Sequence, residues 1–133
     1  MSANLESVRS IYANWERGDF GRTAGLHPEI AWAYVGGPEP GSGTGIRELG
    51  APMRGWLAAW DEWHLKATEY RELDEERILV FGRGVGRGRT SGLEIGQLVT
   101  DGANLFEVHD GKVTRLVTYW DRDDALADLG LAE

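Results

Sequence analysis

Four strand-like stretches fill the second half of the chain and constrain its fold more than any other feature. Apolar and polar side chains alternate along them, and clusters of turn residues separate each stretch from the next. The last two are joined around Asp110-Gly111, a pair that tolerates the positive φ values of a tight hairpin. Strands that follow one another through short turns predict an antiparallel meander. The predicted strands cover residues 65–73, 78–89, 93–108 and 113–120.

The first half of the chain is predicted to be mainly helical. Apolar residues recur at three- and four-residue steps from Leu5 to Trp15, which places them on one face of a helix that ends at Gly18. A strand follows Pro28, and a loop rich in glycine and proline covers residues 36–45. Helical spacing resumes from Leu49 and predicts a helix that ends near residue 61.

A short final helix is predicted at residues 122–129, stopped by Gly130. Helices followed by a strand meander indicate an α+β fold, with the helices against one face of the sheet. At 133 residues the chain is expected to be a single domain, residues 1–133, with one core.

Charge and composition exclude several classes of function. The 14 basic and 22 acidic residues give a net charge of −8, which disfavours nucleic acid and anionic membranes as partners. No apolar run is long enough for a membrane span, and the first ten residues do not resemble a signal peptide. The chain has no cysteine, so a cytoplasmic location is the simplest expectation.

Tryptophan is unusually frequent, with six residues spread along the chain. They indicate either a highly aromatic core or the lining of a cavity. The six tryptophans are Trp15, Trp32, Trp56, Trp60, Trp63 and Trp120.

The order and spacing of several short motifs resemble the SnoaL-like branch of the nuclear-transport-factor-2-like (NTF2-like) superfamily, over residues 5–131. This resemblance implies a cone: a curved, mixed or antiparallel sheet wrapped around the N-terminal helices, with a central pocket. It also implies a homodimer. The superfamily includes ketosteroid isomerases, polyketide cyclases, limonene-epoxide-type hydrolases and binding domains, so the fold does not fix the function. The motifs are YANWERGDF from Tyr12, HPEIAW from His27, SGTGI from Ser42 and FEVHDGKVTRLVTYWDRDDALADLGL from Phe106.

The resemblance to ketosteroid isomerase can be followed residue by residue. Tyr34 falls where that family has its catalytic base, and Asn104 where it has a protonated aspartate. Ile11, beside Tyr12, falls at the oxyanion tyrosine. The base is therefore replaced, while the Asn104 amide keeps the ability to donate a hydrogen bond to a carbonyl oxygen.

The epoxide hydrolases and polyketide cyclases give weaker correspondences. The hydrolase relay would place Thr118 and Val85 at its two aspartates and Arg83 at its arginine, so neither carboxylate is kept. A cyclase needs an acid or base deep in the cone, and Asp121 is the nearest carboxylate. Asp121 also precedes a helical run with Asp124 three residues on, which is typical of a helix cap.

Arginine and glycine alternate in the stretch Gly82–Arg89. In a strand the glycines would share one face and the arginines the other. If Arg83 faced the cone, it would be a buried cation that needs a carboxylate or an anionic ligand. Otherwise the bare glycine face allows another surface, such as a dimer partner, to approach closely.

No metal or cofactor is expected. The three histidines, His27, His64 and His109, have no metal-ligand spacing, and no glycine loop of the phosphate-binding type opens onto a helix.

The sequence leaves two main hypotheses open. One is a cofactor-free isomerase, cyclase or hydrolase that acts on a small, largely apolar, oxygenated substrate; the other is a non-catalytic ligand-binding or dimerisation domain. In the first, Tyr34 would be an acid or hydrogen-bond donor, Asn104 would polarise an oxygen, Arg83 would supply charge and Asp121 would be the available carboxylate. The expected pocket lining is Tyr12, Trp15, Trp32, Trp56, Trp60, Thr118 and Trp120.

Overall fold

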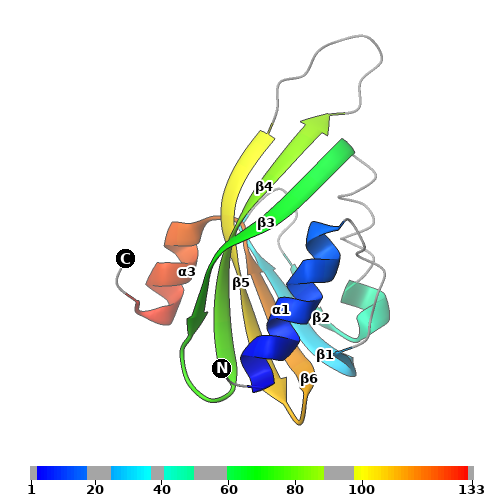
Figure 1. The fold of residues 1–133 in the computed structure, drawn as a ribbon, viewed down its shortest axis with the longest axis vertical. Coiled ribbons are helices and arrows are strands. Elements are labelled where there is room, and N and C mark those ends of the chain that lie inside the picture. The colour runs from blue at the N-terminus through cyan, green and yellow to red at the C-terminus, as the bar shows by residue number, and fades with distance from the viewer. Residues whose placement is uncertain (1–2, 18–24, 37–40, 50–59, 89–97, 132–133) are drawn as a thin grey trace.

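The computed structural model describes residues 3–17, 25–36, 41–49, 60–88 and 98–131. A six-stranded sheet carries helices on both of its faces (Figure 1). Residues 46–49, between β2 and β3, are also helical. The labelled elements are α1 (Ala3–Glu16), β1 (Leu26–Val35), β2 (Gly41–Thr44), β3 (Trp60–Glu72), β4 (Arg77–Gly88), β5 (Leu98–His109), β6 (Lys112–Tyr119) and α3 (Arg122–Leu129).

The sheet is mixed, curved and open. Its strand order is β2-β1-β6-β5-β4-β3, so β2 and β3 form the two edges. The pair β1–β6 is parallel and every other neighbouring pair is antiparallel. Strands β3 to β6 therefore form the meander that the alternating sequence predicts, and they bend along their length (Figure 1). The predicted α+β cone fold is confirmed.

Each face of the sheet has its own apolar cluster. On one face the buried stripe of α1 packs against side chains such as Ile30, Val80 and Phe106. On the other face Ala125 and Leu126 of α3 pack against residues that include Leu105. Because successive strand residues point to opposite faces, the two clusters use alternate positions of the same strands. The chain thus has a distinct α1 face and α3 face, and the predicted site residues divide between them.

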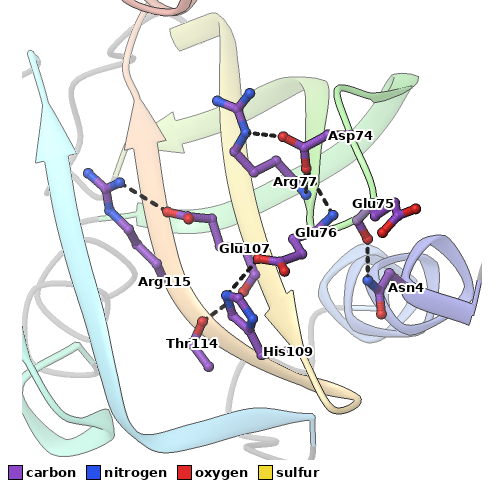
Figure 2. Close-up of polar contacts among 9 residues, drawn as sticks. All are labelled: Asn4, Asp74, Glu75, Glu76, Arg77, Glu107, His109, Thr114 and Arg115. Atoms are coloured by element: carbon purple, nitrogen blue, oxygen red, sulfur yellow. Dashed lines mark hydrogen bonds and ion pairs between the residues drawn. The ribbon is translucent and has the colours of Figure 1, made fainter.

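Polar contacts hold α1 at the end of the sheet where the β3–β4 and β5–β6 turns meet (Figure 2). The Asn4 side chain donates to the Glu75 carbonyl at 2.6 Å. His109 Nε2 lies 3.2 Å from a Glu76 carboxylate oxygen, which links the two turns. Asp74 accepts hydrogen bonds from the backbone N–H groups of Glu76 and Arg77 and from the Arg77 guanidinium.

The Asp74 contacts predict a specific dependence of stability on pH. The Arg77 hydrogen bond, with the two backbone donors, lowers the pKa of Asp74 from 3.8 to about 2. A lowered pKa in the folded state stabilises the fold above the unfolded pKa and loses that effect as the carboxylate protonates. In urea unfolding measurements, the wild type should exceed the Asp74→Asn variant in stability above about pH 4. This difference should shrink as the pH falls below about 4 and be lost as it falls through about 2. A difference that stays constant from pH 6 to 2 would contradict this account.

Two local predictions differ from the structure. Trp60 was assigned to the end of a helix by its spacing from Trp56, but it is the first residue of β3. Residues 41–44 were expected in a loop and form the edge strand β2, which pairs with β1 from Ala31↔Thr44 to Tyr34↔Gly41. Trp56 lies outside the described residues.

Candidate functional site

A row of paired residues crosses the middle of the sheet. Backbone register places Tyr34 of β1 beside Thr118 of β6, Thr118 beside Asn104 of β5, and Asn104 beside Val80 of β4. Tyr70 of β3 continues the row. Neighbours in register point to the same side of a sheet. This row therefore brings the polar side chains of β1, β6, β5 and β3, which are far apart in the sequence, onto the α1 face.

Asn104 is the centre of a buried hydrogen-bond network. Its Nδ2 group donates to the Tyr12 hydroxyl oxygen at 2.7 Å, and its Oδ1 atom accepts from the Thr118 hydroxyl at 2.7 Å. Asn104 is only 8% exposed, and among the described residues it is the one polar residue that is buried. A buried amide is costly unless its polar atoms are satisfied. In the network Tyr12–Asn104–Thr118, one amide hydrogen and the amide oxygen of Asn104 each have a hydrogen-bond partner.

Tyr12 brings a phenol from α1 into this network. Its ring is fully buried and packs against Trp15, Tyr70 and Phe106, with centroid separations from 5.1 to 6.1 Å. Burial raises the pKa of Tyr12 far above its ordinary value, so the hydroxyl stays protonated. Gly82 lies directly against the phenol: a methyl group at that position would lie 3.4 Å from the hydroxyl oxygen and 3.2 Å from the Lys66 carbonyl oxygen.

Two donor hydrogens of this network have no acceptor among the described residues. A primary amide has two N–H hydrogens, and the described residues accept only one of those on Asn104. The Tyr12 hydroxyl accepts from Asn104, and its own hydrogen has no acceptor in the described part of the chain. A cluster of neutral donors suits a ligand oxygen, and above all one that gains negative charge.

Tyr34 and Trp32 extend the candidate site along β1. Their rings meet edge to face at a centroid separation of 5.6 Å, and both are half-buried against the α1 core. Burial raises the pKa of Tyr34, so this hydroxyl is also a donor near neutral pH. The Trp32 Nε1 atom is buried and has no hydrogen-bond partner among the described residues.

Arg83 and Asp121 lie away from this network, contrary to the catalytic roles that the sequence suggested. Arg83 alternates with the buried Gly82 and Gly84, so it points to the α3 face, where its side chain is 59% exposed and pairs with Asp101 at 3.0 Å. Asp121 is the N-cap of α3, and its carboxylate accepts from the Asp123 backbone N–H at 2.8 Å. The helix-cap interpretation of Asp121 is confirmed.

The tryptophans of the predicted pocket lining have different surroundings in the structure. Trp15 is 6% exposed and packs on Phe106 and Tyr12 as part of the core. Trp120 follows β6, is half-buried, and donates its backbone N–H to the Val35 carbonyl. The side chain of Trp60 and all of Trp56 lie outside the described residues.

The sequence predicts Tyr12 only as pocket lining, without its contact to Asn104, and gives no indication of Glu48. Tyr12 was placed beside the family's oxyanion position rather than on it, and the structure shows that Tyr12 itself contacts Asn104. A shift of one residue turns a helical side chain by about 100°, so only the buried stripe of α1 could have corrected this alignment. Glu48, near Trp32, gave no signal beyond the start of a helix.

Within the described ranges, no three His, Asp or Glu side chains gather as metal ligands would. The helices of the same ranges include none that is both long and apolar enough to cross a membrane.

Comparison with solved structures identifies the fold. An NTF2-like protein from Burkholderia thailandensis E264 superposes with a TM-score of 0.77 and 21% identity, covering 97% of this chain and 98% of the other. The fold is NTF2-like. TerC, co-crystallised with polyporic acid, matches at TM-score 0.73 and 24% identity, with 96% and 98% of the chains covered. A candidate SnoaL-like polyketide cyclase from Jannaschia sp. CCS1 gives 0.73 and 13%, over 98% and 94%.

No family model matches the NTF2-like chain, and no curated protein matches its sequence. The resemblance to NTF2-like and SnoaL-like proteins therefore rests on the fold, which covers nearly the whole chain.

Proposed function

We propose that this protein binds a small, largely apolar, oxygenated molecule on the α1 face of its sheet and converts it by isomerisation or cyclisation without a cofactor. The buried network Tyr12–Asn104–Thr118 carries the proposal, since it holds spare donor hydrogens inside an apolar core. Hydrolysis has less support because Arg83, which falls at the arginine of the hydrolase relay, lies away from the network. Asp121, the carboxylate suggested for cyclisation, caps α3 instead, so a cyclisation would have to rely on the neutral donors. Similar folds among candidate polyketide cyclases and the ligand complex of TerC add support.

The chemistry follows from the protonation states of the site. Tyr12 and Tyr34 both have raised pKa values and Asn104 is neutral, so these groups donate hydrogen bonds. Donors fixed in a water-poor environment stabilise an enolate or alkoxide oxygen more than the neutral carbonyl from which it forms. In this scheme a solvent water or hydroxide takes the proton from the carbon next to the carbonyl, while Asn104 and Tyr12 stabilise the enolate oxygen. Tyr34 donates a further hydrogen bond or a proton, and solvent returns the proton that completes the isomerisation.

Ligand binding without catalysis is the second candidate. Its support is specific: the network consists of hydroxyl and amide groups alone, and none of these takes a proton readily near neutral pH. The same donors would then orient a ligand oxygen, and the surrounding aromatic side chains would bury its apolar body.

A binding experiment with 1-tetralone, a small apolar cyclic ketone, tests the proposal. Isothermal titration should show saturable binding to the wild type, with at least about tenfold weaker binding to Thr118→Val, because that change leaves Asn104 Oδ1 unpaired and disturbs the network. Thr114→Val is the matched control, since Thr114 lies on the same strand and makes only a 3.4 Å contact to the Glu107 carbonyl. Equal binding to all three proteins would refute the proposed role of the network.

Turnover distinguishes the two candidates. Solvent deuterium exchange at the carbon next to the ketone, followed by NMR, reports enolate formation directly. Exchange that the wild type accelerates and Tyr34→Phe slows supports an enzyme. Saturable binding without any acceleration supports a binding protein.

A further inference from the structure

Trp32 presents a buried hydrogen-bond donor that the fold itself does not use. Its Nε1 atom is shielded from solvent and has no partner among the described residues. A buried donor left unpaired costs about 1–3 kcal/mol, so such groups in folded proteins usually serve a bound molecule or an ordered water. The indole lies on the α1 face, in contact with the Tyr34 ring. The unused N–H group of Trp32 is therefore part of the candidate site, beside Tyr34.

Gly43 of β2 has no side chain, and this allows the Trp32 indole to lie against the strand backbone. A methyl group there would lie 2.7 Å from Trp32 Cζ2 and 2.9 Å from Cε2, the carbon bonded to Nε1. The nitrogen-bearing edge of the indole thus lies directly over the β2 backbone, and only glycine permits this approach.

Glu48 supplies an acceptor at the same place. One of its carboxylate oxygens, Oε2, would lie 2.6 Å from the same methyl position, so this oxygen and Trp32 Cε2 are no more than about 5.5 Å apart. The carboxylate accepts from the Thr44 backbone N–H at 3.1 Å, which fixes its orientation. A carboxylate has about four lone-pair sites, so Glu48 keeps capacity for another donor.

A buried donor on Trp32 and an acceptor on the exposed Glu48, both lying over Gly43, match a hydroxyl group. A hydroxyl can accept from Trp32 Nε1 and donate to Glu48 at the same time, whereas a carbonyl satisfies only the indole and is repelled by the carboxylate. We propose that Trp32 and Glu48, converging over Gly43, form a subsite for a hydroxyl group of the ligand. This deepens the proposed function: the ligand class becomes apolar ketones that carry a second, hydroxyl oxygen.

The test compares 1-tetralone with its ring-hydroxylated isomers, 5-, 6- and 7-hydroxy-1-tetralone. At least one isomer should bind the wild type about tenfold more tightly than 1-tetralone does, as one additional satisfied hydrogen-bond pair allows. Trp32→Phe keeps an aromatic ring but removes the N–H, so it should reduce this preference to less than about twofold. The readout is the ratio of the two affinities within each protein, because Trp32 belongs to the candidate site and its replacement also changes the binding of 1-tetralone.

Glu48→Gln should also weaken the preference, because the amide can still accept from Thr44 but loses the carboxylate charge. Glu29→Gln, at an exposed position of β1, is the matched control and should leave the preference intact. A second measurement guards against misfolding of Trp32→Phe. In the wild-type NMR spectrum, the Trp32 indole N–H signal, assigned by triple-resonance experiments on the wild type itself, should move downfield with the preferred isomer and not with 1-tetralone.

The outcomes separate the two claims. Binding of 1-tetralone with no isomer preferred, or a preference that survives in Trp32→Phe, overturns the subsite and leaves the proposed function standing. An indole signal that no isomer moves shows that Nε1 is served by a resident water and also overturns it. Failure of every tetralone to bind the wild type counts against the ligand class and the subsite together.

Discussion

Replacing Asn104 with leucine is expected to lower turnover of a ketone substrate about 10²–10³-fold, the usual effect of losing one donor to a developing oxyanion. The same change should destabilise the protein by about 2–4 kcal/mol. Leucine fills a similar space but leaves the buried Tyr12 hydroxyl and the part-buried Thr118 hydroxyl without their partner. Urea unfolding and deuterium-exchange rates measure the two effects separately.

Asn104→Asp distinguishes catalysis from stability in this experiment. When protonated, an aspartic acid can donate a hydrogen bond in place of the amide, while its charged form is strongly disfavoured at a buried site. Activity of Asn104→Asp should therefore return as the pH is lowered, whereas Asn104→Leu should stay inactive. Equal activity of wild type and Asn104→Leu, with both folded, would remove Asn104 from the site.

Replacing Gly102 with alanine is expected to destabilise the fold by about 3 kcal/mol, more than most point substitutions. A methyl group there would lie 2.6 Å from the Tyr119 carbonyl oxygen and 3.2 Å from that of Trp120. Both obstacles are backbone atoms, so the β5–β6 pairing next to Asn104 must move. Thermal and urea unfolding give the size of the loss.

Gly41→Ala is the matched control for this substitution. Gly41 lies in the edge strand β2, and a methyl group there meets no atom within 4 Å. Its effect should stay within about 0.5 kcal/mol of zero, as for most exposed positions. If both alanines cost the same, close backbone packing at Gly102 is not the reason for its glycine.

The meander could be predicted because its strands are joined by short turns and alternate clearly. The parallel pairing of β1 with β6 could not, since it joins residues such as Tyr34 and Thr118 that are far apart in the sequence. Strand β2 escaped prediction because Gly41–Thr44 carries no apolar side chain. Trp60 follows Trp56 at helical spacing, yet tertiary pairing with Gly88 makes it the start of β3.

Only part of the site could be predicted from the sequence. Alternation predicts that the glycines and arginines of β4 lie on opposite faces, and the structure agrees for the described residues Gly82, Arg83 and Gly84. It did not reveal which face meets α1, because residues 78–81 are apolar at every position. The sequence therefore leaves open whether Arg83 faces the cone, and in the structure its side chain lies on the α3 face, paired with Asp101. Asn104 and Thr118 were identified as candidates, but their hydrogen bond is a property of strand register alone.

The infrared carbonyl stretch of ¹³C=O-labelled 1-tetralone tests the central claim most directly, because its frequency falls as hydrogen bonds to the oxygen strengthen. Bound to the wild type, the carbonyl should absorb at lower frequency than in water, since Asn104 and Tyr12 hold it in a site that excludes water. Bound to Asn104→Leu, it should absorb near its value in an apolar solvent. The same frequency in both proteins would contradict the claim that this network receives the ligand oxygen.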